Sequence, residues 1–269
     1  MKKALNAWTV ESSLSFEEMF AAVAAAGFDG IELNVDRPGS AHGLSMETTD
    51  AEFSAIRALS EKYNLPVISI STSLAGGESG QPDRWDYARA LLRQQIRAAK
   101  ALGAKGVLTV PGGKTLKSGH ENSIAFFREM REEIEREGIF VGLENVWNGF
   151  FLSPYDMQRI IDAVGSPMIG AYLDLGNMLA FSKPEQWVEV LENRIGFVHL
   201  KDYLRNGNLS RGGSWQDITH GSADWDAIMA ALRAVGFDGY LTAEVGKEDD
   251  AMSFEEYYRK VAGELASIM

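Results

Sequence analysis

Ile-Gly-Phe-Val-His-Leu-Lys-Asp-Tyr-Leu-Arg, residues 195–205, joins a short apolar run to a polar end. Gly196 and the polar stretch 206–208 bound the run, so Phe197–Leu200 is predicted to be a buried strand that emerges at a polar surface. His199 lies at that end. Three other strand-like runs finish with a carboxylate, at Glu144, Asp174 and Glu244. A single carboxylate at a strand end is as often a salt-bridge residue as a metal ligand. One histidine and three carboxylates at the ends of consecutive strands favour a divalent-metal site.

Strand-like runs recur eight times along the chain, and each is followed by a helical pattern. The predicted strands are Ala4–Trp8, Ile31–Asn34, Val67–Ser71, Val107–Val110, Phe140–Asn145, Gly170–Asp174, Phe197–Leu200 and Leu241–Val245. Helices are expected after Ser15, Thr49, Ser153 and Ser253, and over Arg84–Leu102, His120–Glu137, Pro184–Asn193 and Ala223–Val235. Glycines such as Gly27, Gly103 and Gly236 are typical of helix ends just before a strand.

Eight β/α units in 269 residues predict an α/β fold of the (β/α)8 TIM barrel type. The alternative is an open doubly wound sheet, which more often carries a glycine-rich turn after its first strand. Here Trp8-Thr9-Val10-Glu11 occupies that place. No linker or low-complexity tract divides the chain, so we expect one domain over residues 1–269.

The composition narrows the class of protein. Hydrophobic residues make up 45% of the chain and no run approaches the ~20 apolar residues of a membrane span, so no membrane partner is expected. The first residues lack the apolar stretch of a signal peptide. With no cysteine, disulfides and thiolate ligands are excluded, and a reducing, cytoplasmic setting is expected. The net charge of −12 argues against a nucleic-acid partner.

Four segments carry a resemblance to a known family: Leu143–Asn148, Leu173–Asn177, Val198–Asp202 and Gly239–Glu244. Together they resemble the xylose isomerase-like barrel superfamily. Within it they are most similar to the sugar-phosphate isomerase/epimerase branch, which includes ketose 3-epimerases and the L-xylulose- or L-ribulose-5-phosphate 3-epimerases. The resemblance covers essentially the whole chain.

The resemblance implies a set of site residues. Glu144, Asp174, His199 and Glu244 would hold one divalent ion (Mn, Mg or Co, with Zn also possible), and the two glutamates would transfer protons. Arg205, six residues after the histidine, matches an arginine that contacts substrate oxygens. Asn177 stands where many members have a substrate-contacting histidine, which leaves the substrate open.

The expected reaction is 3-epimerisation of a ketose, as a sugar or sugar phosphate, through a metal-stabilised cis-enediolate. Proton removal by one glutamate and return by the other from the opposite face would invert C3. Aldose–ketose isomerisation would use the same residues. A second class is a lyase that dehydrates a polyol or cyclic hydroxyketone. The abasic-site nucleases of the superfamily use a multi-zinc cluster rich in histidine, whereas this chain has four histidines and only one at a matching strand end. A non-catalytic sugar-binding barrel is the remaining alternative.

Further substrate contacts are predicted beside these residues, each with a structural alternative. Lys201 follows the strand of His199, and Glu32 ends a strand, where a salt bridge is the alternative. Trp8 and Trp147 can stack on a sugar or pack in the core, and His42 can line the mouth or lie in a surface loop. The loop Arg205–Gly213 is a candidate phosphate grip or a mobile loop. A homodimer or homotetramer is expected from the resemblance.

Overall fold

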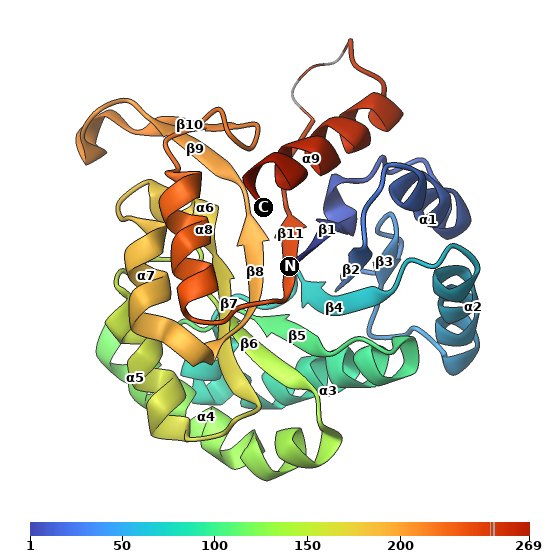
Figure 1. Ribbon diagram of the computed structural model, residues 1–269. Helices are drawn as coiled ribbons and strands as arrows, with labels where there is room; N and C mark the ends of the chain where they lie inside the picture. The colour runs from blue at the N-terminus through green and yellow to red at the C-terminus, as the bar shows by residue number, and fades with distance from the viewer. Residues whose placement is uncertain (248, 250) are drawn as a thin grey trace.

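The structure, a computed structural model, describes residues 1–247, 249 and 251–269. Within these residues eight parallel strands form a barrel (Figure 1): β1 (Lys2–Asn6), β2 (Gly30–Val35), β4 (Val67–Thr72), β5 (Gly106–Thr109), β6 (Phe140–Glu144), β7 (Ile169–Asp174), β8 (Ile195–Leu200) and β11 (Tyr240–Ala243). Strand β1 pairs with both β2 and β11, which closes the sheet. The predicted TIM barrel is therefore confirmed.

Helices follow the strands and surround the barrel: α1 (Phe16–Ala25), α2 (Asp50–Lys62), α3 (Trp85–Leu102), α4 (Leu116–Glu137), α5 (Pro154–Val164), α6 (Leu175–Leu179), α7 (Pro184–Leu191), α8 (Trp225–Ala234) and α9 (Phe254–Ile268). Short 3₁₀ turns occur at Ala7–Thr9, Glu78–Gly80, Pro82–Arg84, Glu192–Arg194 and Leu209–Arg211. The capping boxes expected at Ser15, Thr49 and Ser253 are present. Among the described residues, none of the helices is both long and apolar enough to cross a membrane.

The barrel interior is filled near the amino ends of its strands. Side chains from five strands form this apolar layer: Ala4, Ile68, Leu108, Tyr172 and Phe197. Tyr172 and Phe197 stack with ring centroids 5.1 Å apart. Opposite them Gly106 has no side chain, and a Cβ there would collide with the Phe197 ring. Because strand residues alternate, His199 also points inward, two residues closer to the carboxyl end.

The loop predicted over Arg205–Gly213 is the connection of a hairpin that follows the strand of His199. Strands β9 (Asp202–Arg205) and β10 (Gly213–Gln216) pair antiparallel, and Tyr203 lies opposite Trp215 with ring centroids 5.2 Å apart. The sequence did not show it because each strand has only four residues. A cross-strand aromatic pair stabilises such a ribbon once the two segments meet. A further two-residue strand, β3 (Gly43–Leu44), pairs in parallel with the carboxyl end of β2.

Helix α4 begins at Leu116, four residues before the predicted start at His120. Thr115 is the N-cap, and its hydroxyl accepts a hydrogen bond from the Ser118 amide. His120 therefore lies inside the helix, buried with its ring 4.5 Å from that of Phe150. The prediction missed the start because the first turn has no acidic residue.

Asp202 fixes the base of the hairpin. Its fully buried carboxylate accepts hydrogen bonds from the amides of Tyr203, Gly221 and Ala223. It also accepts one from the indole of Trp225, at 3.1 Å. The carboxylate thus joins the hairpin to the start of α8.

We predict that Asp202→Ala destabilises the protein by about 3 kcal/mol, because removal of a charged acceptor leaves buried N–H groups unpaired. Urea unfolding followed by circular dichroism measures the change. Asp226→Ala, at an exposed position of α8, is the control and should cost less than about 1 kcal/mol. Equal stability of the two variants would contradict the anchoring role.

Candidate metal centre

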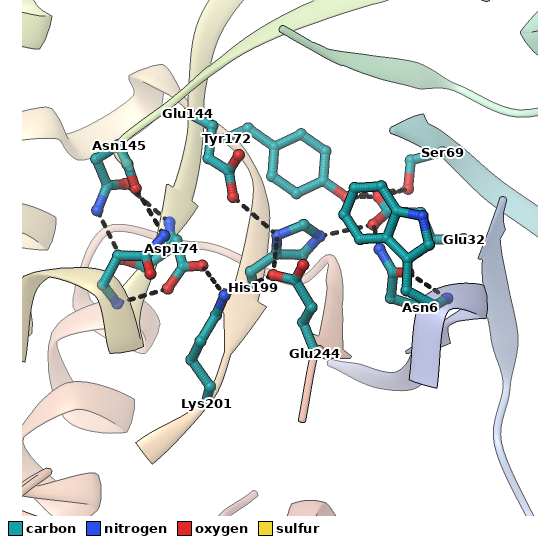
Figure 2. Close-up of polar contacts among 12 residues, drawn as sticks. Asn6, Glu32, Ser69, Glu144, Asn145, Tyr172, Asp174, His199, Lys201 and Glu244 are labelled. Atoms are coloured by element: carbon teal, nitrogen blue, oxygen red, sulfur yellow. Dashed lines mark hydrogen bonds and ion pairs between the residues drawn. The ribbon is translucent and has the colours of Figure 1, made fainter. Parts of the chain in front are cut away.

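Four strand ends bring the predicted ligands together at the carboxyl end of the barrel (Figure 2). Glu144 ends β6, Asp174 ends β7, His199 lies in β8, and Glu244 directly follows β11. Each offers one ligand atom, and these atoms lie within 4.8 Å of one another. The predicted convergence of the four side chains is therefore observed.

His199 is the centre of this group. Its Nδ1 lies 3.2 Å from Glu144 Oε1 and 3.3 Å from Glu244 Oε2. Its Nε2 lies 2.7 Å from Glu32 Oε1, on the other side of the ring. An outer carboxylate on one nitrogen fixes the orientation of a metal-binding imidazole and directs the other nitrogen at the ion.

Glu32 is fully buried behind His199. Asn6 Nδ2 donates to it at 2.6 Å, Ser69 Oγ donates at 2.5 Å, and the Tyr172 hydroxyl donates as well. The predicted contact of Glu32 with a sugar is therefore not what the structure shows. The inward direction of β2 places the side chain deep inside the barrel, where it positions His199.

A second set of hydrogen bonds holds Asp174. Its backbone amide donates to Asn145 Oδ1 at 2.9 Å, and its Oδ1 accepts from the Asn177 amide at 2.8 Å. Asn177 Nδ2 in turn donates to the carbonyl of Asn145. Asp174 Oδ2 is buried and lies 2.9 Å from the Lys201 ammonium. The backbone amide of Asn177 thus holds Asp174, while its side chain bonds the backbone of Asn145.

Lys201 closes the group on its open side. Its ammonium lies 2.9 Å from Asp174 Oδ2 and 2.7 Å from Glu244 Oε2. The stem passes Gly176, where any Cβ would collide with Lys201 Cγ. The ammonium also lies 5.5 Å from the centre of the Trp215 ring.

Burial and mutual charge shift the ionisation of the cluster. Burial raises the pKa of Glu144 to about 7. Burial also opposes the charged form of His199, but the carboxylates of Glu32 and Glu244 outweigh it and raise the pKa of the imidazole well above its usual value. The pKa of Lys201 is raised for the same kind of reason, since Asp174 and Glu244 outweigh its burial.

The residues present fit a divalent ion. Three carboxylates and one imidazole are a donor set that suits Mg²⁺, Mn²⁺, Co²⁺ or Zn²⁺. Asp174 lies within this group with one oxygen next to the Lys201 ammonium, and Nε2 of His199 is already bonded to Glu32, which leaves Nδ1 for an ion. The four side chains can therefore hold an ion if the Lys201 ammonium leaves Asp174 Oδ2 and Glu244 Oε2.

An aromatic wall stands beside the cluster. Trp147 stacks on Trp215 with ring centroids 5.0 Å apart, and Tyr203 packs edge-on against both. A pocket of about 350 Å³ is lined by Lys201, Trp215, Gln216, Glu244, Val245 and Gly246. The hairpin register places Arg205 on the same face as Tyr203 and Trp215. The pocket is therefore bounded by Glu244 of the four-residue cluster and by Lys201, which lies against it.

Two further predicted contacts, His42 and Trp8, are each hydrogen-bonded to a partner outside the four-residue cluster. His42 is buried, with its Nε2 2.6 Å from the carbonyl of Leu14, and it packs edge-on against Phe16. It holds the loop after β2 against α1 and does not line the mouth as expected, because its ring nitrogen is engaged by the backbone. Trp8 is 41% exposed, and its indole donates to Asp36 at 2.8 Å.

A second histidine–carboxylate group consists of Asp217, His220 and Glu264. Lys260 already bridges the two carboxylates, at 3.1 Å from Glu264 and in contact with Asp217. The group joins the end of the hairpin to α9. We interpret it as a structural ion-pair network.

Several site residues were not predicted. Asn6, Ser69 and Tyr172 surround Glu32, and Asn145 holds Asp174. Alternation along the strands could have identified Tyr172, which is two residues before Asp174 and shares its face. The contribution of Trp215 had no comparable signal, since it comes from the unpredicted hairpin.

The fold and the site define a TIM barrel protein with a candidate divalent-metal centre at the carboxyl ends of its strands. A model of the xylose isomerase-like TIM barrel family matches residues 20–267. The chain therefore belongs to that family.

Similar proteins differ in their reactions. The 3-oxo-isoapionate decarboxylase of Pectobacterium atrosepticum is 26% identical over 194 residues, which cover 68% of this chain and 66% of the relative. The match thus spans just under two thirds of that relative's length. D-Psicose 3-epimerase, crystallised in the presence of D-fructose, superposes with a TM-score of 0.80 at 16% identity, over 99% of this chain and 98% of that one.

The crystal structure of the IOLI protein with a zinc atom also superposes with a TM-score of 0.80 at 16% identity, over 100% of this chain and 98% of that one. At such low identity both structures show that the fold is shared.

We predict that Glu32→Gln lowers the affinity for Mn²⁺ by about 10–100-fold, because the outer carboxylate no longer orients His199 or raises its basicity. Isothermal titration calorimetry on the metal-free protein measures the change. Glu47→Gln, at an exposed position, is the control and should bind like the wild type. An unchanged affinity of Glu32→Gln would show that the ion does not use His199.

We also predict that Mn²⁺ affinity rises with pH between 6 and 8. A carboxyl group with a pKa of about 7, that of Glu144, is protonated below that pH and must lose its proton to bind an ion. His199 has to lose a proton as well. The affinity should therefore change by about tenfold or more per pH unit in the lower part of this range. A flat profile would contradict the prediction.

Proposed function

We propose that this protein is a divalent-metal-dependent isomerase that acts on a ketose, as a sugar or sugar phosphate, and epimerises it at C3. The observation that carries the proposal is the placement of two glutamates about the same histidine nitrogen, at 3.2 Å and 3.3 Å. They come from β6 and from the end of β11, with β7 and β8 between them in the barrel. This arrangement supports a pair of proton-transfer groups on two sides of one substrate.

The chain's own residues have distinct parts in the proposed reaction. A divalent ion bound by the four side chains would supply Lewis-acid polarisation of the substrate carbonyl and its neighbouring oxygen. One glutamate, Glu144 or Glu244, removes the proton from C3. The other returns a proton from the opposite face, which inverts that carbon.

Residues at the pocket mouth would bind the substrate. Lys201 and Trp215 line the pocket that reaches Glu244, and Trp147 stacks behind Trp215. An ammonium can donate to hydroxyl oxygens, and an aromatic face can pack on the C–H groups of a sugar. Arg205, on the same face of the hairpin, can hold a distal hydroxyl or a phosphate.

We predict exchange of the C3 proton when the Mn²⁺-loaded protein is incubated with ketoses in D₂O, measured by NMR. Pentuloses, hexuloses and their phosphates should be compared. Glu144→Gln and Glu244→Gln should each lower the exchange by about 10²–10⁴-fold, the usual contribution of a general acid or base. Glu47→Gln is the control. Absence of exchange with every ketose would contradict the proposal, and exchange at C1 and C2 would indicate an aldose–ketose isomerase.

A lyase is the second candidate, and the similarity to a decarboxylase favours it. The same polarised carbonyl would stabilise the carbanion left when the bond to a carboxylate carbon breaks and carbon dioxide leaves. A glutamate would then donate the proton to that carbon. Release of carbon dioxide from a β-keto sugar acid, or absorbance of an enone formed by dehydration, would distinguish a lyase from an epimerase.

A further inference from the structure

Lys201 occupies a position built for its side chain. The aliphatic part of the Lys201 side chain passes over Gly176. It fits there only because residue 176 has no Cβ. The Trp215 ring covers the ammonium on another side. The side chain is 15% exposed, so the ammonium is largely removed from water. A charge held in this way needs close counter-charges.

Those counter-charges are two of the proposed metal ligands. The ammonium lies 2.9 Å from Asp174 Oδ2 and 2.7 Å from Glu244 Oε2. Glu244 Oε2 is also the oxygen that lies 3.3 Å from His199 Nδ1. The other oxygen of Asp174 accepts the Asn177 amide, so the ammonium is the close partner of Oδ2. The ammonium and a divalent ion would therefore use the same two oxygen atoms.

Two cations on shared oxygens repel each other. Like charges a few ångström apart in a partly buried site interact strongly, because little water screens them. The ammonium has an alternative position, since the pocket of about 350 Å³ begins at Lys201 and Trp215. Entry of an ion can thus push the ammonium away from the carboxylates and toward the space that a substrate would fill.

We propose that Lys201 is an internal counter-cation of the metal centre, which neutralises Asp174 and Glu244 in the metal-free protein and lowers the affinity for a divalent ion. The proposal rests on the proposed metal-dependent function. Lys201 is then a positioning residue. When an ion enters, the ammonium leaves the two carboxylates and becomes free at the pocket. A neutral residue of the same length should bind the ion more tightly.

The test is the affinity for Mn²⁺ of the full chain, measured by electron paramagnetic resonance of free Mn²⁺ at fixed pH, without substrate. Lys201→Met keeps the apolar stem and removes the charge. We expect its dissociation constant to fall about tenfold or more relative to the wild type, within the range usual for coupling between two sites. Lys201→Gln is a second neutral variant. Lys201→Arg keeps the charge and should remain within about threefold of the wild type.

Lys183→Met controls for total charge, since Lys183 is an exposed residue at the start of α7. It should bind Mn²⁺ like the wild type. Thermal unfolding gives an independent readout. Without metal, Lys201→Met should melt below the wild type, because two carboxylates lose their counter-charge, and Mn²⁺ should raise its melting temperature by more.

Equal or weaker Mn²⁺ binding by both neutral variants would overturn the role of Lys201. If the wild type and all variants bind no Mn²⁺, the metal centre and this inference fail together. If the wild type binds Mn²⁺ but exchanges no ketose proton, the proposed reaction fails. In that case the ratio of the Mn²⁺ affinities of Lys201→Met and the wild type still decides the role of Lys201.

Discussion

Negative charge buried at one end of the barrel is the constraint on which the site depends. Four carboxylates meet there: Glu32, Glu144 and Asp174 are buried, and Glu244 is partly exposed. Buried charges are costly unless they are paired and hydrogen-bonded. In the chain itself His199 and Lys201 supply the positive charge, and a ring of amide and hydroxyl donors holds Glu32 and Asp174. Such a cluster is costly for stability alone, which supports a functional reason for it.

Along the same strands, the inward side chains form an apolar layer toward the amino ends and the polar cluster at the carboxyl ends. Toward the amino ends the interior is apolar, with Tyr172 stacked on Phe197. Toward the carboxyl ends the interior becomes polar: the Tyr172 hydroxyl donates to Glu32, and the next inward residue of β8 after Phe197 is His199. The tightly packed layer therefore forms a rigid floor beneath the ligands. Rigid strand ends suit a site whose ligands have to keep a fixed geometry.

The hairpin gives this barrel its particular mouth. Asp202 anchors it immediately after the strand of His199, and Tyr203 and Trp215 meet Trp147 from the loop after β6. The aromatic wall beside the cluster thus comes from segments 56 to 68 residues apart in sequence, whereas the four clustered side chains come from the strand ends. Loop variation on a constant barrel is how related barrels support different reactions, consistent with relatives that include an epimerase and a decarboxylase.

Sequence periodicity was sufficient for the architecture, because alternation, capping residues and helix-ending glycines act locally. It also predicted that Glu144, Asp174, His199 and Glu244 lie close together, as they do, since parallel strands present their carboxyl ends at one face. Only the tertiary structure decided how the other polar residues are used. Whether a side chain at a strand end meets solvent or a buried neighbour depends on strands far apart in the chain. For that reason Glu32 proved to be a support for His199, His42 a packing residue, and Lys201 the cation between two ligands.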